Sequence, residues 1–253
     1  MTERHLAPAG TQLTIGDPIP QAIVLATWLR AWLDQKASSD EVLAALEIFG
    51  PHRFTTGDDE EGLFTGLNAI GVKPDVQLRA VLPAPGDPSG LPGPPVFNQA
   101  ATEAGQALLI FGTGHGLIPH TDITTTWIAQ PIDDSNIHTP DISPEQASSE
   151  VRAALLEATN SLADFTQSVS REEVAGELSA LNRKLDRTRL PRSLDSSRQH
   201  TIRLAAQVYG ICQIAEHFTS HQPTSSATVK QAALLAQLSR TARRALAASA
   251  SSR

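Results

Sequence analysis

Two histidines, an aspartate and a run of glycines follow one of the most apolar segments of the chain. The segment 107–111 reads Ala-Leu-Leu-Ile-Phe and leads directly into Gly112-Thr-Gly-His-Gly116. Backbone amides of a glycine-rich turn can cradle an anion, whereas imidazole and carboxylate groups suit zinc, iron or manganese. The stretch therefore has two chemical interpretations, a phosphate-type site and a metal site.

Neither interpretation matches a motif with the required context. A dinucleotide-binding fingerprint needs its glycines to open a helix, but Leu117-Ile118-Pro119 indicates extended chain. His115, His120 and Asp122, with His138, fit no metal-binding spacing that we recognise. We therefore favour a tight structural turn at 112–116, and we expect neither a bound metal nor another cofactor.

Other catalytic patterns are missing from the sequence. It contains no Gly-x-Ser-x-Gly nucleophile elbow. Its single cysteine, Cys212, falls among apolar residues of a helical pattern, where a thiol normally packs and does not react. The sequence alone therefore neither identifies an activity nor decides whether the protein is an enzyme.

The glycine stretch belongs to a longer pattern that begins at Val76. Strand-like apolar runs at 76–82 and 107–111 flank a Pro/Gly-rich loop, 83–95, and a short helix at 99–104. We interpret this pattern as a β-α-β unit. The loop would then leave the carboxyl end of its strand, where open α/β sheets bind ligands. The candidate ligand-binding residues are therefore Asp87, Gly112, Gly114, His115, His120 and Asp122.

The order of patterns along the chain predicts two domains. Residues 1–142 alternate short helices with strand-like runs, including 52–56 and 124–130, which predicts an α/β domain with a small three- to four-stranded sheet. From 143 to 253, apolar residues recur every three or four positions. That spacing predicts a C-terminal domain built as an all-α bundle of four helices.

Charge is divided unevenly between these two domains. Residues 1–142 hold 17 acidic and 6 basic residues, and residues 143–253 hold 10 and 14. Seven of those bases fall within 183–203: Arg183, Lys184, Arg187, Arg189, Arg192, Arg198 and Arg203. This segment either docks on the acidic N-terminal domain, which we favour, or binds an anionic partner. Nucleic acid is disfavoured because the net charge is −7 and no aromatic residues stand nearby to stack bases.

The N-terminus has no basic region followed by an apolar core, so we expect no secretory signal. The apolar run 19–33 is shorter than a membrane helix and contains Gln21 and Arg30. We therefore expect a cytoplasmic protein that does not enter a membrane.

One segment carries a family resemblance. Leu-Pro-Ala-Pro-Gly-Asp-Pro-Ser-Gly-Leu at 82–91, with Gly-Pro-Pro-Val-Phe-Asn-Gln-Ala-Ala-Thr-Glu-Ala-Gly at 93–105, resembles an uncharacterised actinobacterial protein family. The resemblance implies a following Trp-containing strand and a helical C-terminal half. It implies no activity and no functional residue.

Two functions follow as hypotheses. The first is a non-catalytic intracellular interaction or scaffold protein, whose helical half contacts a protein partner or a second copy of the chain. The second is a small-molecule or anion-binding protein, which includes an enzyme, with its site at the ends of the central strands. A ligand site requires a pocket with convergent polar groups, whereas a docking surface requires an exposed apolar patch.

Overall fold

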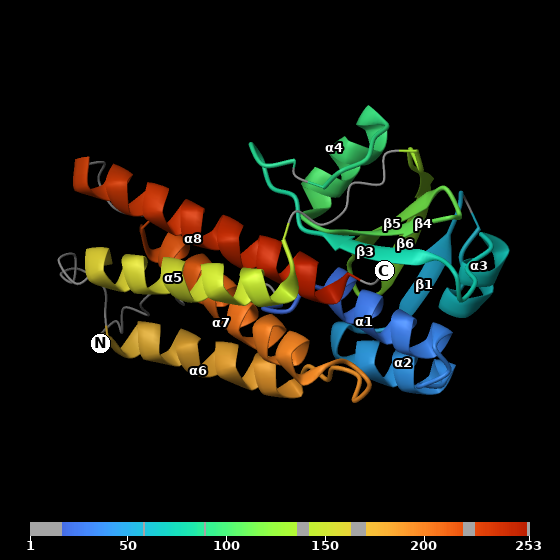
Figure 1. Cartoon of the computed structure of the whole chain (residues 1–253), viewed down its shortest axis with the longest axis horizontal. Helices are drawn as coiled ribbons and strands as arrows, with labels where there is room; N and C mark the ends of the chain where they lie inside the picture. The colour runs from blue at the N-terminus through green and yellow to red at the C-terminus, as the bar shows by residue number, and fades with distance from the viewer. Residues whose placement is uncertain are drawn as a thin grey trace, which may run out of the picture.

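The computed structural model describes residues 17–57, 59–88, 90–135, 142–162, 171–219 and 226–251. Within them, an α/β half precedes a helical half (Figure 1). The α/β half contains α1 (Gln21–Leu33), α2 (Ser39–Leu46), a 3-10 turn η1 (Glu47–Phe49), β1 (His52–Thr55), β2 (Glu61–Gly62), α3 (Leu63–Ala69), β3 (Gln77–Val81), α4 (Pro95–Ala104), β4 (Ala107–Phe111), β5 (His115–Thr121) and β6 (Thr125–Pro131). The helical half contains α5 (Pro144–Leu162), α6 (Arg171–Arg187), α7 (Ser196–Thr219) and α8 (Ser226–Ala250).

The strands form one mixed sheet of six strands in the order β2-β1-β6-β5-β4-β3. Only the β1–β6 pair is parallel among the described strands, and the other neighbours are antiparallel. The α/β architecture is therefore confirmed, but the prediction of three or four strands is too low. The sequence pattern missed β5, where Pro119 and His120 obscure the apolar alternation, and β2, which has two residues.

The predicted β-α-β unit is wrong. β3 and β4 are direct neighbours and antiparallel, with Val81 opposite Ala107 and Gln77 opposite Phe111. The loop after β3 and the glycines after β4 therefore leave opposite ends of the sheet, so the carboxyl-end rule for parallel strands does not apply. The helix between them also begins earlier than predicted, at Pro95, and Asn98 within it accepts a hydrogen bond from the Gly93 amide.

Helices cover the two faces of the sheet unequally. Figure 1 shows α1 and α2 below the sheet and α4 above it. α1 packs on the face that buries Leu78, Leu108 and Trp127. α4 packs on the other face through Phe97, and a Cβ at Gly116 would lie 2.4 Å from the Phe97 ring. Glycine at 116 thus lets α4 approach β5 closely, and α4 leaves the neighbouring part of that face open.

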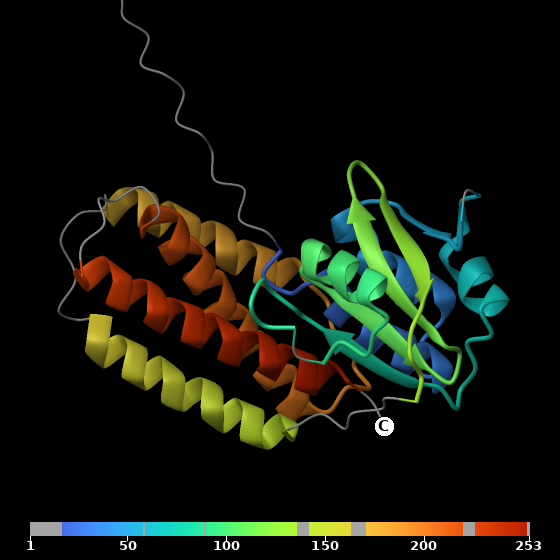
Figure 2. The ribbon, with the colours of Figure 1, turned by 90° about the horizontal axis from the view of Figure 1, so that it is seen from above.

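The helical half is arranged around α7, which packs against α5, α6 and α8. Figure 2 shows these helices side by side, as the heptad spacing predicts. Leu235, Leu238 and Leu246, three of the apolar residues that recur at helical spacing in this half, are buried. Gly210 of α7 lies against Leu181 of α6, where a Cβ would approach Leu181 Cδ1 to 2.3 Å.

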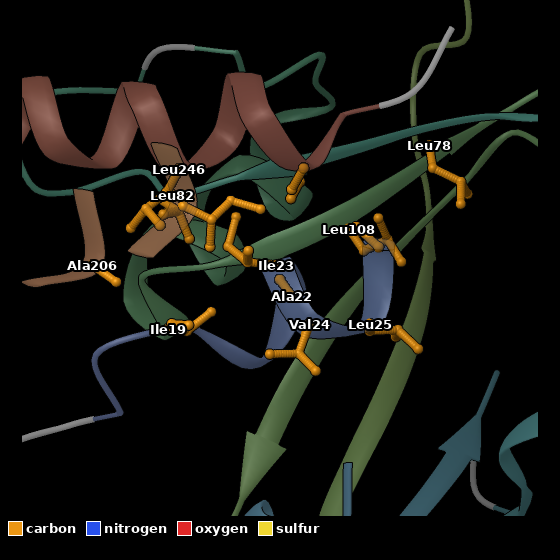
Figure 3. Close-up of a cluster of buried hydrophobic side chains, with 14 of the residues drawn as sticks. Ile19, Ala22, Ile23, Val24, Leu25, Leu78, Leu82, Leu108, Ala206 and Leu246 are labelled. Carbon is orange, nitrogen blue, oxygen red and sulfur yellow. The ribbon is translucent and has the colours of Figure 1, made fainter. Parts of the chain in front are cut away.

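The core continues without a break from one half into the other. Figure 3 shows Ile19 and Ile23 close to Leu82, Ala206 and Leu246, which come from the end of β3, α7 and α8. These side chains are buried. Burial of a full Leu or Ile side chain stabilises by about 1.5–3 kcal/mol, so the halves share a substantial apolar contact.

A buried arginine adds a polar connection across this contact. Arg243 of α8 donates to the Leu82 carbonyl at 3.2 Å and to Asp87 Oδ2 at 2.8 Å. Its side chain is 9% exposed and that of Asp87 is 12% exposed. Arg240 lies 3.5 Å from the same carboxylate but is 56% exposed. Asp87 and the loop after β3 are thus held by the helical half.

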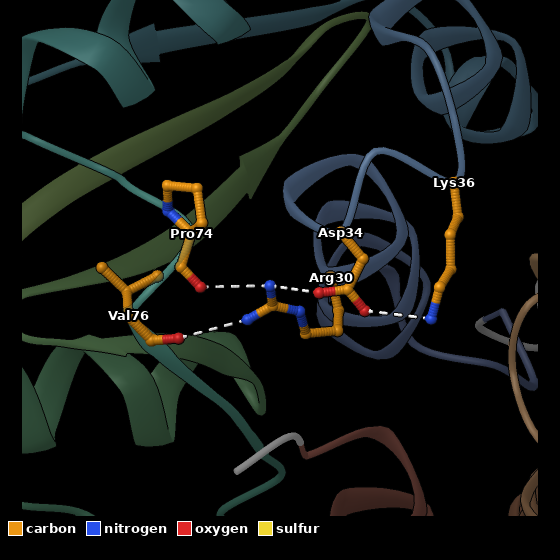
Figure 4. A network of polar contacts seen from close by, with 5 residues as sticks. All are labelled: Arg30, Asp34, Lys36, Pro74 and Val76. Carbon is orange, nitrogen blue, oxygen red and sulfur yellow. Dashed lines mark hydrogen bonds and ion pairs between the residues drawn. The ribbon is translucent and has the colours of Figure 1, made fainter.

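Two further contacts connect the halves. Trp28 Nε1 of α1 donates to the Arg189 carbonyl at 2.8 Å, and Lys184 Nζ lies 3.7 Å from Asp17 Oδ1. Within the α/β half, Arg30 donates to the carbonyls of Pro74 and Val76 and pairs with Asp34 (Figure 4). These bonds fix α1 to the start of β3 on one side and to the helical half on the other.

The Arg243–Asp87 pair yields a stability prediction. Asp87→Ala should lower the free energy of unfolding by about 3–5 kcal/mol, because it leaves a buried guanidinium without its carboxylate. Arg240→Met removes an exposed cation from the same carboxylate and should cost less than about 1 kcal/mol. Urea denaturation measures both. The double variant Asp87→Leu/Arg243→Met should recover most of the loss, and a loss equal to the single variant would contradict the assignment.

Candidate functional site

A groove of about 600 Å³ lies beside α4, over the part of the sheet that this helix leaves open. We call it the α4 groove. It is formed by α4, the β5–β6 hairpin, the start of α1 and the residue before β4. Its lining residues are Asp17, Gln21, Ala100, Glu103, Ala104, Gln106, Ile118, Pro119, His120, Thr121, Ile128 and Gln130.

The groove has an apolar side and a polar side. Ile118 and Ile128 are opposite each other in the β5–β6 register, and Ala100 and Ala104 face them from α4. Amide, hydroxyl, imidazole and carboxylate groups make up the remainder of the lining. An apolar surface with a few convergent polar groups is the usual composition of a small-molecule site.

Gln21 is the most constrained polar side chain of the lining. Its Nε2 donates to Thr121 Oγ1 at 3.2 Å, and Thr121 Oγ1 lies 3.2 Å from Thr125 Oγ1. The residue is only 5% exposed, yet its Oε1 has no hydrogen-bond partner among the described residues. A buried acceptor without a donor costs about 1–3 kcal/mol, so this oxygen lowers the stability of the free protein by about that amount.

Gln106 fixes the position of Gln21. α1 begins after Pro20, whose side chain offers no cap, and the Ala22 amide donates to Gln106 Oε1 at 3.0 Å. The cap of this helix therefore comes from a residue that is 84 positions away. It satisfies one of the free amides at the helix start and holds the first turn of α1 against the end of the sheet.

Carboxylates dominate the charge of the groove. Asp17 and Glu103 line it, and no lysine or arginine does so among the described residues. Burial raises the pKa of Asp17, while the charge of Lys184 and its hydrogen bond act in the opposite direction. Glu103 is exposed and accepts a bond of 2.9 Å from Gln99 Nε2. The groove thus suits a donor-rich or cationic group better than an anion.

Among the six candidate residues from the sequence, His120 lines the groove. Asp122 follows β5 in the turn, where its amide donates to the Thr124 carbonyl. His115 begins β5, five residues before His120, which places the two histidines roughly 17 Å apart along the strand. His115 Nδ1 donates to the Thr113 carbonyl at 2.7 Å. The structure therefore separates the two histidines.

The amides of Gly112 and Gly114 bind a carboxylate, but it is the side chain of Asp134 in the same protein. Both amides donate to Asp134 Oδ2, at 3.0 and 3.1 Å. Both glycines have positive φ, as the tight turn between β4 and β5 requires. The amide chemistry that the sequence suggests is therefore present, with Asp134 as the bound carboxylate.

The remaining candidate, Asp87, lies at the contact between the halves and pairs with Arg243. The far end of its loop contacts the chain that follows β6, since the Asp133 amide donates to the Gly93 carbonyl at 3.3 Å. No group of three His, Cys, Asp or Glu residues lies close enough to hold a metal within the described ranges. His138 lies outside those ranges.

Sequence reasoning missed His52 as well as the groove residues Gln21, Glu103 and Gln106. His52 Nδ1 accepts from Trp127 Nε1 at 2.9 Å, and its Nε2 lies 3.1 Å from the Leu46 carbonyl. These two bonds define a neutral ring with its proton on Nε2. Burial lowers the pKa of His52, against a smaller opposite effect of the Leu46 carbonyl.

Two family models match most of the chain. The N-terminal domain model of the Rv1486c-like proteins covers residues 22–141, and their C-terminal domain model covers residues 145–247. The chain belongs to the Rv1486c-like family. The resemblance drawn from residues 82–105 is thereby confirmed.

Two curated relatives are both Mycobacterium tuberculosis proteins with the printed names Uncharacterized protein Rv1486c and Uncharacterized protein MT1533. Each is 32% identical to this chain over 123 residues, which is 39% of this chain and 43% of the relative. The chain therefore matches less than half the length of either relative. No solved structure matches the chain.

The segment that carries the family resemblance, residues 82–105, divides between two parts of the structure. Residues 82–91 include Asp87, which binds Arg243, whereas residues 93–105 include α4 and contribute Glu103 to the groove.

None of the described helices is long and apolar enough to span a membrane.

Gln21 allows a direct test of the orphaned oxygen. Gln21→Met has nearly the same shape, removes the bond to Thr121 and also removes the unsatisfied Oε1. Because these two effects oppose each other, the free energy of unfolding should change by less than about 1 kcal/mol or increase. Thermal and urea denaturation measure it, with Gln106→Met as a comparison that loses the α1 cap and should be destabilised by about 1 kcal/mol.

His52 predicts a pH dependence. Since the folded-state pKa lies below the value of about 6.5 in an unfolded chain, its contribution is complete above that pH. The contribution is lost as the pH falls toward the folded-state pKa, with a slope of at most about 1.4 kcal/mol per pH unit. The variant His52→Asn should show a shallower decline in unfolding free energy between pH 7 and 5. An equal decline in both proteins would disprove this role for His52.

Proposed function

We propose that this protein binds a small molecule that carries a protonated amine or another strong hydrogen-bond donor on a short apolar body. The α4 groove is the proposed site. In this role the α/β half provides the groove, and the helical half holds its parts in place.

The observation that carries the proposal is the unpartnered Oε1 of Gln21, a residue that is 5% exposed and lines the groove. Native proteins rarely leave a buried acceptor unsatisfied. Because the oxygen itself is buried, an N–H donor from a ligand would reach it after the Gln21 amide turns toward the groove. The energetic cost that the free protein carries would then be recovered on binding.

Charge and size support a donor ligand of modest size. Asp17 already pairs with Lys184, so Glu103 is the carboxylate of the lining that can attract a cation, and a charge-assisted hydrogen bond is roughly twice as strong as a neutral one. The volume of about 600 Å³ lies within the range of ordinary ligand sites. Ile118 and Ile128 offer apolar surface for the body of the ligand. An anion would meet the Glu103 carboxylate without a lysine or arginine in the described lining, so the anion-binding alternative is disfavoured.

The hypothesis of an interaction protein that acts through its helical half stays a prediction. Among the described residues of that half, Leu156 of α5 and Val229 of α8 are the large exposed apolar side chains. Two exposed apolar side chains make a small patch, so they support a docking surface less well than the groove supports a ligand.

Matched probes test the proposed ligand class. Phenethylamine, its N-acetyl derivative and 3-phenylpropionate have similar bodies but carry a cation, a neutral amide and an anion, respectively. NMR titration of the full chain should show the amine binding most tightly and the carboxylate most weakly. Glu103→Gln should weaken amine binding about fivefold, equivalent to roughly 1 kcal/mol.

The chain offers a closely matched control for this change. Gln146 and Glu150 of α5 form the same (i, i+4) pair as Gln99 and Glu103 of α4, but lie away from the groove. Glu150→Gln should leave amine binding unchanged. Gln21→Met should abolish binding while the protein stays folded. Equal binding of amine and carboxylate, or amine binding that survives in Gln21→Met, would refute the proposal.

A further inference from the structure

The α2 side of the molecule carries an exposed surface that is separate from the α4 groove. Asp40, Leu43 and Glu47 recur at helical spacing and are all exposed, as is Ile48 in η1. Leu43 is 40% exposed and Ile48 is 45% exposed. We call the surface formed by Asp40, Leu43, Ala44, Glu47 and Ile48 the α2 face.

A second groove indents this face. It has a volume of about 590 Å³ and is lined by Leu43, Ala44, Glu47, Gly50, Pro51 and His52. Ile123 of the β5–β6 turn is 85% exposed, and its carbonyl lies 3.0 Å from the position of a Cβ at Gly50. Leu43, Ile48 and Ile123 therefore bring exposed apolar side chains to the region around the groove.

An arginine-rich segment packs against α1, the helix that also supports α2. The connector 188–195 follows α6, and the Arg189 carbonyl accepts the bond from Trp28 of α1, the helix on which α2 also packs. Figure 1 shows α2 and this connector at the same lower edge of the molecule. Arg183, Arg187, Arg189 and Arg192 are exposed. We call these four residues the arginine corner.

The basic segment 183–203 contacts the α/β half through Lys184 and the Arg189 carbonyl, but the guanidinium groups of the arginine corner form no ion pair there among the described residues. Lys184 pairs with Asp17, but no ion pair joins any of the four corner arginines to another described residue. A second ion pair at the contact between the halves uses Arg243, far along the chain. The corner thus keeps its charge available for another molecule.

We propose that the α2 face and the arginine corner form a self-complementary interface, through which two copies of this chain associate around a twofold axis. A twofold axis makes every contact twice. The acidic α2 face of one copy would meet the arginine corner of its partner, with Leu43 and Ile48 at the centre. An apolar centre, a charged rim and arginine enrichment are typical of protein interfaces.

Charge complementarity selects a second copy as the occupant. The arginine corner carries four exposed arginines, and the α2 face carries the exposed carboxylates Asp40 and Glu47. A twofold pair places these opposite charges against each other, whereas a nucleic acid would contact the acidic α2 face along with the corner. The interface shares no lining residue with the α4 groove, so the inference is independent of the proposed ligand.

Sedimentation velocity of the full chain tests the association. A dimer should form at low ionic strength and dissociate progressively as salt screens the exposed charges. Leu43→Asp should weaken the dimer at least about tenfold, as expected for a charge placed at the centre of an interface. Val96→Asp is the matched control because Val96 of α4 is 73% exposed on another side, and it should not change the dimer.

Charge reversal tests the pairing of the two surfaces. Glu47→Arg alone and Arg189→Glu/Arg192→Glu alone should each weaken the dimer, whereas their combination should restore it, because opposite charges again face each other. Circular dichroism confirms that each variant is folded. A protein that is monomeric at every salt and protein concentration tested would overturn the proposal. A dimer that tolerates Leu43→Asp, or reversals that do not compensate, would overturn it equally.

Discussion

The contact of Arg243 with the loop after β3 is the interaction on which the arrangement of the molecule depends. A guanidinium of this kind is stable in a buried position only when carbonyl and carboxylate groups surround it. Leu82 and Asp87 supply those groups, so the loop is held against α8. Burial raises the pKa of Glu216 and of Tyr209 on α7, and Arg243 opposes both shifts. The same arginine therefore stabilises negative charge in both halves.

The contacts that hold α1 in place give the open groove a defined shape. The apolar core that joins α1 to α7 and α8 fixes the axis of α1, and Gln106 fixes its first turn. Gln21 is thus held at the groove by elements on three sides, although its carbonyl oxygen has no donor of its own. The helical half consequently supports the proposed site, although none of its described side chains lines the groove. Lys184, which pairs with Asp17, provides the most direct electrostatic connection between that half and the groove.

The sequence predicted those features that depend on residues close together along the chain. The four C-terminal helices, the buried Leu235 and the turn at Gly112 follow from apolar spacing and from glycine, so they could be predicted. Strand order could not, because β1 pairs with β6 about seventy residues later and the hydrophobic pattern does not encode partners. The groove was beyond prediction for the same reason. Gln21 and Thr121 lie 100 positions apart, and neither has a local signal of function.

The proposed site depends on the claim that the two halves fold as one cooperative unit. Unfolding followed with two spectroscopic probes tests this claim directly. All three tryptophans belong to the α/β half, whereas most helical residues belong to α5–α8. Tryptophan fluorescence therefore reports the first half, and the far-ultraviolet circular dichroism of helices mainly reports the second. If the Arg243 contact and the shared core join the halves, the two signals should change together in a single urea transition. A helical signal that persists after the fluorescence transition is complete would show that the halves unfold separately and would contradict the account.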